Sequence, residues 1–467
     1  MKPRYWSRTL PEISLTVRTA LVLVDGEHYP PVIRAALAEL SARGIRAVAA
    51  LFLGGSEKVA SHGAVVDVGV PSTWADGDPS GAVRALIAEH QVDIVVDLSD
   101  EPVLDPRGRM RLAAHALYAG VPYEGPDFRF TPPPRPALAN RPTIAVIGTG
   151  KRTGKTALCG EVARVVQRHG RTPVIVAMGR GGPPEPILVP ARSPLDAFEL
   201  LRIADAGGHA ASDFYEDAVT TGAATVGARR CGGGLAGAVG NSNVVQAVER
   251  ANQLTGDLLL LEGSGAAIPP VRADATLLVV PGDCDPEFVR GYLGSYRVLL
   301  ADLVAVTMCE SPRSSPAQVE AVLRAIRSVS QRVDIVRTVL RPVPLGPVSG
   351  AKVFFATTAP TPVTAELAGY LQERYGCEVV ATSSHLADRP ALRADLERAG
   401  TFDVLLVELK AAAVDVAARA AIAAGARTVV CDNRPVVVRP TGEIEGEETF
   451  AGLVRQLVDL ADTRFAK

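Results

Sequence analysis

The strongest constraint on the fold is a series of apolar runs that are almost uninterrupted and that each end in turn residues. A strand with one exposed face alternates apolar and polar residues, whereas a strand covered on both faces is apolar throughout. Strands of the second kind form parallel sheets with helical crossovers. In the middle of the chain we expect such strands near 144–148, 172–178, 257–263, 275–281 and 302–308.

The same rhythm continues on both sides of this middle part. The first 130 residues alternate apolar runs at 19–25, 46–53 and 92–98 with helical patterns near 31–43, 80–90 and 107–119. The last part has runs at 352–358, 377–383, 402–409 and 426–432. We therefore predict an α/β protein of three Rossmann-like βα layers, the central one having a mainly parallel sheet.

Two proline-rich segments, 131–142 and 341–350, can continue neither a helix nor a central strand. They predict domains at 1–135, 141–345 and 348–467.

Composition excludes several classes of function. The formal net charge is -2, so no overall basic field attracts nucleic acid or an anionic membrane. The six cysteines include no CxxC pair, which argues against a zinc site and favours core thiols in a reducing compartment. Residues 1–13 lack the apolar region of a signal peptide, and no uncharged apolar stretch of roughly 18 residues follows. We expect a cytoplasmic protein.

A nucleotide-binding loop is predicted after the first strand of the middle part, in "IAVIGTGKRTGKTALCG" at 144–160. A phosphate loop needs backbone N–H groups around the anion, a lysine for the terminal phosphates and a hydroxyl for Mg²⁺ at the helix start. Gly154, Lys155 and Thr156 supply the end of this pattern, although Thr149 stands where the regular motif has glycine. The predicted nucleotide-binding residues are Gly150, Lys151, Arg152, Thr153, Gly154, Lys155, Thr156 and Ala157.

An acidic residue at the end of a second strand completes such a site by binding Mg²⁺ near the phosphates. The segment "LLLLEGSG" supplies Glu262, and Gly263 and Gly265 leave room for close contacts. We predict Thr156 and Glu262 as metal ligands, with Lys155, Arg180 and Glu262 in catalytic roles.

Residues for a phosphorylated substrate follow three other strands. Arg180 stands in a loop at a strand's carboxyl end, where open α/β sheets bind ligands. The stretch 211–243 combines Asp213, Glu216 and Asp217 with two arginines and a run of glycines, and we interpret it as a substrate-binding loop. The predicted substrate contacts are Arg180, Arg229, Arg230, Gly233, Gly234 and Lys410. Asp25, Glu27 and His28 form a weaker candidate group after the first strand.

The spacing from Gly148 to Thr156 resembles dethiobiotin synthetase and its relatives. Over the whole chain, the segments "LVDGEHYPP", "LFLGGSEKV", "GTGKRTGKTA", "MGRGGPPEP" and "ELKAAAVD" resemble the cyclic 2,3-diphosphoglycerate synthetase family. The resemblance implies a ligase that uses ATP and Mg²⁺ to join the two phosphates of 2,3-diphosphoglycerate, releasing ADP and phosphate. We also expect a homodimer.

Three alternatives remain open at this stage. A kinase acting on a phosphoglycerate could use the same loop, and so could a regulatory or metallochaperone NTPase, although the lysine of that class is displaced here to Lys151. An ATP-grasp ligase, suggested by "VPYEGPD" at 121–127, is disfavoured because such enzymes have no phosphate loop. No N-K-x-D motif ends a strand, so ATP is favoured over GTP by this absence and by the resemblance.

Overall fold

The computed structural model describes residues 17–59, 65–411 and 413–467. The chain divides into two compact units, one reaching to Pro132 and the other running from Pro133 to Lys467, and each is described by itself. In the described part of the chain, no helix combines the length and apolar character that crossing a bilayer requires.

The N-terminal unit is a small doubly wound sheet with strand order β3-β2-β1-β4-β5-β6. All its strand pairs are parallel except β5 with β6. Its elements are β1 (Arg18–Val24), α1 (Pro30–Ala42), β2 (Ile45–Phe52), β3 (Ser72–Trp74), α2 (Pro79–His90), β4 (Ile94–Asp97), α3 (Pro106–Tyr118), β5 (Tyr123–Glu124) and β6 (Arg129–Phe130). The predicted strands and helices of this unit are confirmed within about two residues.

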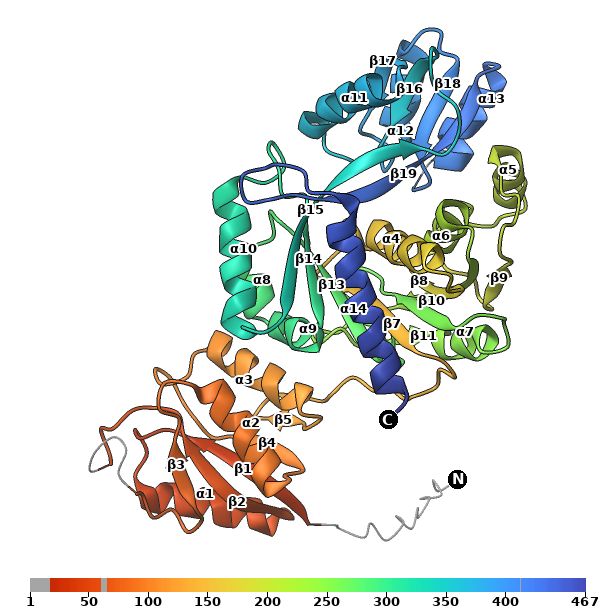
Figure 1. Ribbon diagram of the computed structural model, residues 1–467. Helices are drawn as coiled ribbons and strands as arrows, with labels where there is room; N and C mark the ends of the chain where they lie inside the picture. Colours follow the sequence, from red (N-terminus) through yellow and green to blue (C-terminus); the bar gives the residue numbers. More distant parts are fainter. Residues whose placement is uncertain (1–16, 60–64, 412) are drawn as a thin grey trace, which may run out of the picture. The chain divides into compact units, whose positions relative to one another are not determined.

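The second unit contains one continuous sheet that serves two lobes, with the order β11-β10-β8-β12-β7-β13-β14-β15-β19-β18-β16-β17 and β9 beside β10 (Figure 1). We call residues 133–337 together with the last helix, α14, the P-loop lobe. Its elements are β7 (Thr143–Gly148), α4 (Lys155–Arg168), β8 (Pro173–Gly179), β9 (Ile187–Val189), α5 (Ala197–Asp205), α6 (Asp213–Thr221), β10 (Ala224–Cys231), β11 (Asn241–Ser242), α7 (Val244–Ala251), β12 (Leu258–Glu262), β13 (Ala275–Pro281), α8 (Pro286–Arg290), α9 (Gly294–Leu300), β14 (Leu303–Thr307), α10 (Pro316–Val329) and α14 (Glu447–Phe465).

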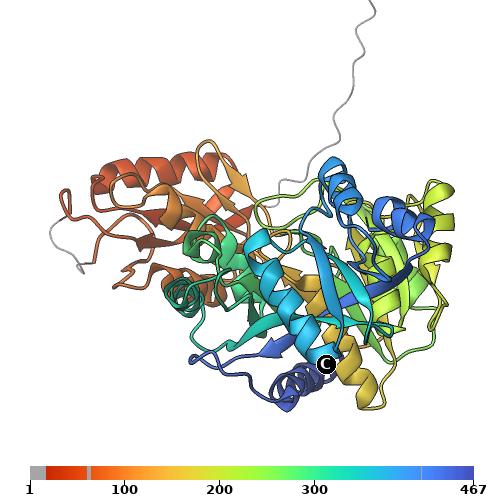
Figure 2. The ribbon, with the colours of Figure 1, turned by 90° about the horizontal axis from the view of Figure 1, so that it is seen from above.

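Residues 338–446 form the C-terminal lobe, which Figure 2 shows in blue beside the yellow and green elements of the P-loop lobe. Its central strand β16 is covered on both faces: Phe355 packs with the side chains of α11, whereas Phe354 packs with those of α12 and η1. Its elements are β16 (Lys352–Ala356), α11 (Thr361–Tyr375), β17 (Glu378–Ser383), α12 (Arg389–Arg398), β18 (Val404–Glu408), the π-helix η1 (Ala413–Ala418), α13 (Arg419–Ala423) and β19 (Arg427–Val437).

A long strand, β15 (Asp334–Pro344), joins the two lobes. Its first residues pair in parallel with β14, and its second half, from Thr338 to Pro344, pairs antiparallel with β19. The sequence suggested a break at the prolines of 341–350, but Pro342 and Pro344 lie inside this strand. A strand that pairs on only one side tolerates prolines because its other edge donates no ladder hydrogen bond. The lobes therefore share a sheet instead of a linker.

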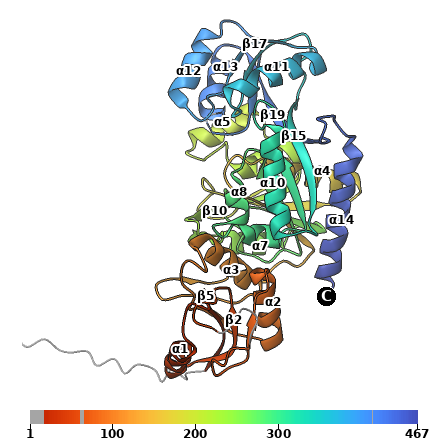
Figure 3. The same ribbon diagram turned by 90° about the vertical axis from the view of Figure 1, so that its left-hand side faces the viewer.

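Helix α14 returns from the C-terminal lobe to the core of the P-loop lobe. Its side chains Val454, Leu457 and Ala461 join the same apolar cluster as Ile144 of β7 and Leu277 of β13. Figures 1 and 3 both show the helix running beside the strands of this lobe. The sequence analysis placed this helix in the third domain, because chain order does not reveal such a return.

Two further expectations change. The stretch 211–243 is not one loop: it contains α6 and β10 before the glycine-rich turn. All six cysteines are free thiols, but only Cys159, Cys377 and Cys431 are buried. Cys231 is exposed because it ends β10 beside that turn, so its interpretation as a core thiol was wrong.

The packing of α14 predicts a stability effect. Leu457→Ala should lower the free energy of unfolding of the full chain by about 2–5 kcal/mol, because Leu457 is buried in the core of the P-loop lobe. Denaturant titration measures this loss, and Gln456→Ala, at an exposed position of the same helix, serves as the control. An equally small loss of unfolding free energy in both variants would contradict the packing of α14 against the P-loop lobe.

Candidate active site

The phosphate loop follows β7 directly and leads into α4, which begins at Lys155. Two residues of the loop, Arg152 and Gly154, adopt positive φ angles of 56° and 94°. At Gly148, a Cβ would lie 2.8 Å from the Thr153 hydroxyl and 2.9 Å from Lys155 Cδ, so only glycine fits there. The turn thus brings the free N–H groups of a helix N-terminus to the edge of the sheet, an arrangement that suits a phosphate.

Lys155 folds back over this loop. Its ammonium donates to the Gly150 carbonyl at 2.7 Å and to the Thr153 hydroxyl at 3.3 Å. Burial lowers the pKa of Lys155 to about 8, against the opposing effect of Glu262. Bound phosphate would raise this pKa again, because an adjacent negative charge favours the ammonium form of an amine.

Glu262 lies next to this loop because β12 pairs with β7. The side chain is 1% exposed, and its Oε1 accepts a hydrogen bond of 2.6 Å from the Thr156 hydroxyl. Its Oε2 is buried and accepts from no N–H or hydroxyl of the described residues, and the Asp217 carboxyl is close enough to share a proton with Glu262. Burial, and then the charge of Asp213, raise the pKa of Glu262 to about 7.

More carboxyl groups reach the same place from the first turn of α6. Asp213 lines the cavity, and Glu216 and Asp217 are buried behind it. Burial raises the pKa of Glu216 to about 8, and burial together with the charge of Glu262 raises the pKa of Asp217 well above its usual range. So many acids in one buried place are costly unless cations are bound among them.

The donor set fits a Mg²⁺ ion that arrives with a nucleotide. Mg²⁺ binds through one or two carboxylates together with phosphate oxygens and waters. The Thr156 hydroxyl and the Oε2 of Glu262 meet that need. Across the described ranges, no three or more His, Cys, Asp or Glu residues are grouped to hold a metal ion by themselves.

Two arginines converge on the turn after β12. A Cβ on Gly265 would lie 3.1 Å from an Nη of Arg230 and 3.4 Å from an Nη of Arg180. Arg230 is 7% exposed; its Nη atoms donate to the carbonyls of Gly232 and Ser264, while its Nε is buried without a partner among the described residues. Burial lowers the pKa of Arg230, and the charge of Arg180 lowers it further. Two guanidinium groups held this close suit a polyanion.

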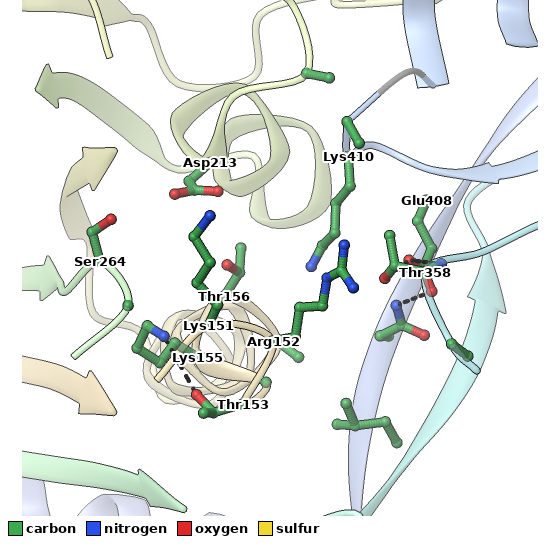
Figure 4. Close-up of a pocket in the computed structure, with 18 of the residues that line it drawn as sticks. Lys151, Arg152, Thr153, Lys155, Thr156, Asp213, Ser264, Thr358, Glu408 and Lys410 are labelled. Atoms are coloured by element: carbon green, nitrogen blue, oxygen red, sulfur yellow. Dashed lines mark hydrogen bonds between the residues drawn. The ribbon is translucent and has the colours of Figure 1, made fainter. Parts of the chain in front are cut away.

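The C-terminal lobe supplies the facing wall. The Lys410 ammonium lies 3.0 Å from the Glu216 carboxylate of α6, so this ion pair joins the two lobes. Glu408 accepts hydrogen bonds from the hydroxyls of Thr357 and Thr358 and from the Asn433 amide at 3.0 Å. In Figure 4, Lys410 points toward Arg152 of the phosphate loop, and Lys151 points toward Asp213.

These groups enclose a cavity of about 600 Å³. Of the predicted site residues, Lys151–Ala157, Arg180, Glu262 and Lys410 line it, and Gly150 and Arg230 contact lining residues. Arg229, Gly233 and Gly234 are exposed and do not line the cavity. Arg229 and Arg230 are neighbours in β10, so their side chains leave opposite faces of the sheet.

Asp25 and His28 belong to the N-terminal unit. Asp25 is fully buried, and its carboxylate accepts from His28 Nδ1 at 2.7 Å and from the Glu27 and Asp100 amides. Among the described residues, these hydrogen bonds tie together the loops that follow β1 and β4.

Sequence reasoning missed the apolar part of the lining. Met308, Leu340 and Val363 line the cavity from three separate segments, and Thr358 and Asn433 join them from the C-terminal lobe. No local motif marks these residues. The one available signal was their position, because Met308 and Thr358 follow the carboxyl ends of strands.

Three family models match successive parts of the chain. They describe the N-terminal domain (residues 19–131), the P-loop domain (143–339) and the C-terminal domain (344–434) of cyclic 2,3-diphosphoglycerate synthetase. A solved structure of LpxK from Aquifex aeolicus with ATP is similar at a TM-score of 0.41 and 12% identity, over 69% of this chain and 90% of that chain.

Curated relatives named cyclic 2,3-diphosphoglycerate synthetase match almost the whole chain. The protein from Rubrobacter xylanophilus is 48% identical, covering 89% of this chain and 94% of the relative. Those from Methanothermus fervidus and Methanothermobacter thermautotrophicus are 43% and 42% identical, over 90% and 94% of this chain and 93% and 97% of the relatives. With all three domains matched in order, the chain belongs to the cyclic 2,3-diphosphoglycerate synthetase family.

Proposed function

We propose that this protein uses ATP and Mg²⁺ to close 2,3-diphosphoglycerate into its cyclic phosphoanhydride, with release of ADP and phosphate. The observation that carries the proposal is the arrangement of the cavity: the phosphate loop and the Thr156–Glu262 pair stand beside two converging arginines. Such a cavity offers one place for a nucleotide triphosphate and a second place for a small polyanion.

The nucleotide site is formed by the phosphate loop. The N–H groups at the start of α4 and the ammonium of Lys155 bind the β- and γ-phosphates. Thr156 and Glu262 would hold Mg²⁺, which supplies neutralisation of charge on the phosphates when bound. Lys155 leaves the Gly150 carbonyl in this state and turns toward the transferred group.

The acceptor site lies over Gly265, between Arg180 and Arg230. The substrate carries two phosphates and a carboxylate, so it needs several fixed cations close to the γ-phosphate. Arg230 is held by backbone carbonyls, and no carboxylate of the described residues forms an ion pair with it, which leaves its charge for the substrate. Lys410 is a further candidate contact from the facing wall.

The chemistry needs no protein nucleophile. An oxygen of one substrate phosphate attacks the γ-phosphorus, and the bond to the β,γ-bridging oxygen breaks as ADP leaves. An oxygen of the second substrate phosphate then attacks the phosphorus of the first. The bond to the new bridging oxygen breaks, the ring closes and inorganic phosphate leaves with that oxygen. Positioning and charge neutralisation supply the rate in both steps.

The homodimer and the cytoplasmic location remain predictions of the sequence analysis.

A kinase that stops after the first step would produce ADP and a linear product, so product analysis separates the two enzymes.

Removing the ammonium of the phosphate loop should abolish useful turnover. Lys155→Ala is expected to lower kcat by at least about a hundredfold, because the transferred group loses its main fixed cation. Release of ADP from ATP with 2,3-diphosphoglycerate measures the effect. Arg168→Ala, at the opposite end of α4, is the matched control. Full activity of Lys155→Ala would remove the nucleotide site from this loop.

The neighbouring arginines of β10 provide a second test. Arg230→Met should raise the KM for 2,3-diphosphoglycerate at least about tenfold with little change in the KM for ATP, because it removes a cation that faces only the acceptor. Arg229→Met should leave both constants near the wild-type values, since Arg229 is exposed and leaves β10 on the face opposite to Arg230. The reverse result, with Arg229 sensitive and Arg230 silent, would contradict the acceptor site.

A further inference from the structure

The cavity has an apolar end that phosphoryl transfer does not use. It is lined by side chains from the residue after β14, from the interior of β15 and from the first half of α11 with the two residues before it, namely Met308, Leu340, Ala359, Pro360, Val363 and Leu367. None of these six side chains carries a charge or a hydrogen-bonding group. This end therefore suits an uncharged, flat ligand group.

The sheet order places this end beside the phosphate loop on the side away from the acceptor. Glu262 is on β12, which adjoins β7 on one side, whereas β13 and then β14 follow on the other side. Met308 directly follows β14, and its neighbour Thr307 donates a hydrogen bond of 2.8 Å to the Thr153 carbonyl of the phosphate loop, so this end adjoins the loop. A nucleotide whose γ-phosphate points toward Glu262 extends its nucleoside in this direction.

The charged groups near the apolar end are already neutralised. The Arg341 guanidinium binds both oxygens of Glu310, at 2.5 Å and 2.7 Å, and also lies over the Tyr370 ring of α11 at 5.6 Å. Arg313 pairs with Asp283 at 2.9 Å. A bidentate pair of this kind occupies one acceptor site on each carboxylate oxygen and fixes the orientation of Glu310, so the two oxygens no longer face N1–H and the amino group of guanine together.

The position of Glu310 bears on which purine base the site binds. It is the fourth residue of the segment Thr307–Glu310 at the end of β14, where the guanine motif N-K-x-D would carry its acid. A free carboxylate there would accept hydrogen bonds from both N1–H and the amino group of guanine, whereas adenine N1 is an acceptor.

We propose that the purine base of the nucleotide binds at this apolar end, against α11 of the C-terminal lobe, and that Arg341 prevents Glu310 from recognising guanine. The inference rests on the proposed nucleotide site and adds to it the wall for the base and the origin of the preference for adenine. Nucleotide binding then brings the two lobes together, because the P-loop lobe holds the phosphates and the C-terminal lobe covers the base.

The location of the base is tested by Val363→Asp. A charge at this wall should weaken ADP binding at least about tenfold, while binding of inorganic tripolyphosphate, which has no base, should not change. Calorimetric titration of the full chain measures both, and Ala365→Asp, at an exposed position of α11 outside the cavity lining, is the control. Met308→Asp repeats the test from the sheet side if Val363→Asp does not fold.

Two results would overturn this location. Unchanged ADP binding in Val363→Asp would place the base elsewhere. Equal losses of ADP and tripolyphosphate would show damage to the phosphate site instead of the base site. In wild-type protein, failure of both ligands to bind would reject the proposed nucleotide site itself, which keeps the two claims distinguishable.

The role of Arg341 is tested by Arg341→Met, which frees the Glu310 carboxylate. The preference for ADP over GDP should fall at least about tenfold, and adding Glu310→Gln should restore it. Arg337→Met is the matched control, because Arg337 lies on the same strand as Arg341 and pairs with Glu320 of α10. An unchanged preference in folded Arg341→Met, or no restoration by Glu310→Gln, would overturn the role of the pair.

Discussion

The structure depends on the burial of opposite charges around the N-terminus of α4. Lys155 and Glu262 are 8% and 1% exposed. Burial favours the neutral form of each group, so it lowers the pKa of Lys155 and raises the pKa of Glu262. Glu216 and Asp217 add further acids behind them. Charged groups persist in such a place when a ligand completes their pairing. The magnesium nucleotide proposed above would supply both signs of charge at once, which accounts for the burial of acids and bases together here.

The fold holds this site by sharing one sheet between two lobes. β15 leaves the P-loop lobe and pairs with β19, so the C-terminal lobe is attached through strands rather than through a flexible linker. The P-loop helix α4 reaches the same strand, since Arg164 lies 3.0 Å from Asp432 of β19, and both side chains are buried. The wall that carries Lys410 and Val363 is thus positioned against the phosphate loop by backbone pairing and by a buried ion pair.

The sequence predicted what is local and missed what depends on distant contacts. The buried strands, the phosphate loop and Glu262 were predictable because each produces a pattern within about ten residues. Arg180 and Lys410 followed from their positions after strands. The pairing of β15 with β19 was not predictable, since Pro342 and Pro344 hide the strand. The apolar wall of Met308, Leu340 and Val363 is assembled from three segments, and the return of α14 to the first core leaves no local signal.

The central claim is that the γ-phosphoryl group of ATP is transferred to a substrate phosphate before the ring closes. The most direct test uses 2,3-diphosphoglycerate labelled with ¹⁸O in its non-bridging phosphate oxygens, unlabelled ATP and unlabelled water, with mass analysis of the inorganic phosphate. The account predicts that each released phosphate carries one oxygen from the substrate, in step with formation of the cyclic product. Phosphate whose added oxygen comes from water would contradict it, because ATP would then be hydrolysed without transfer to the substrate.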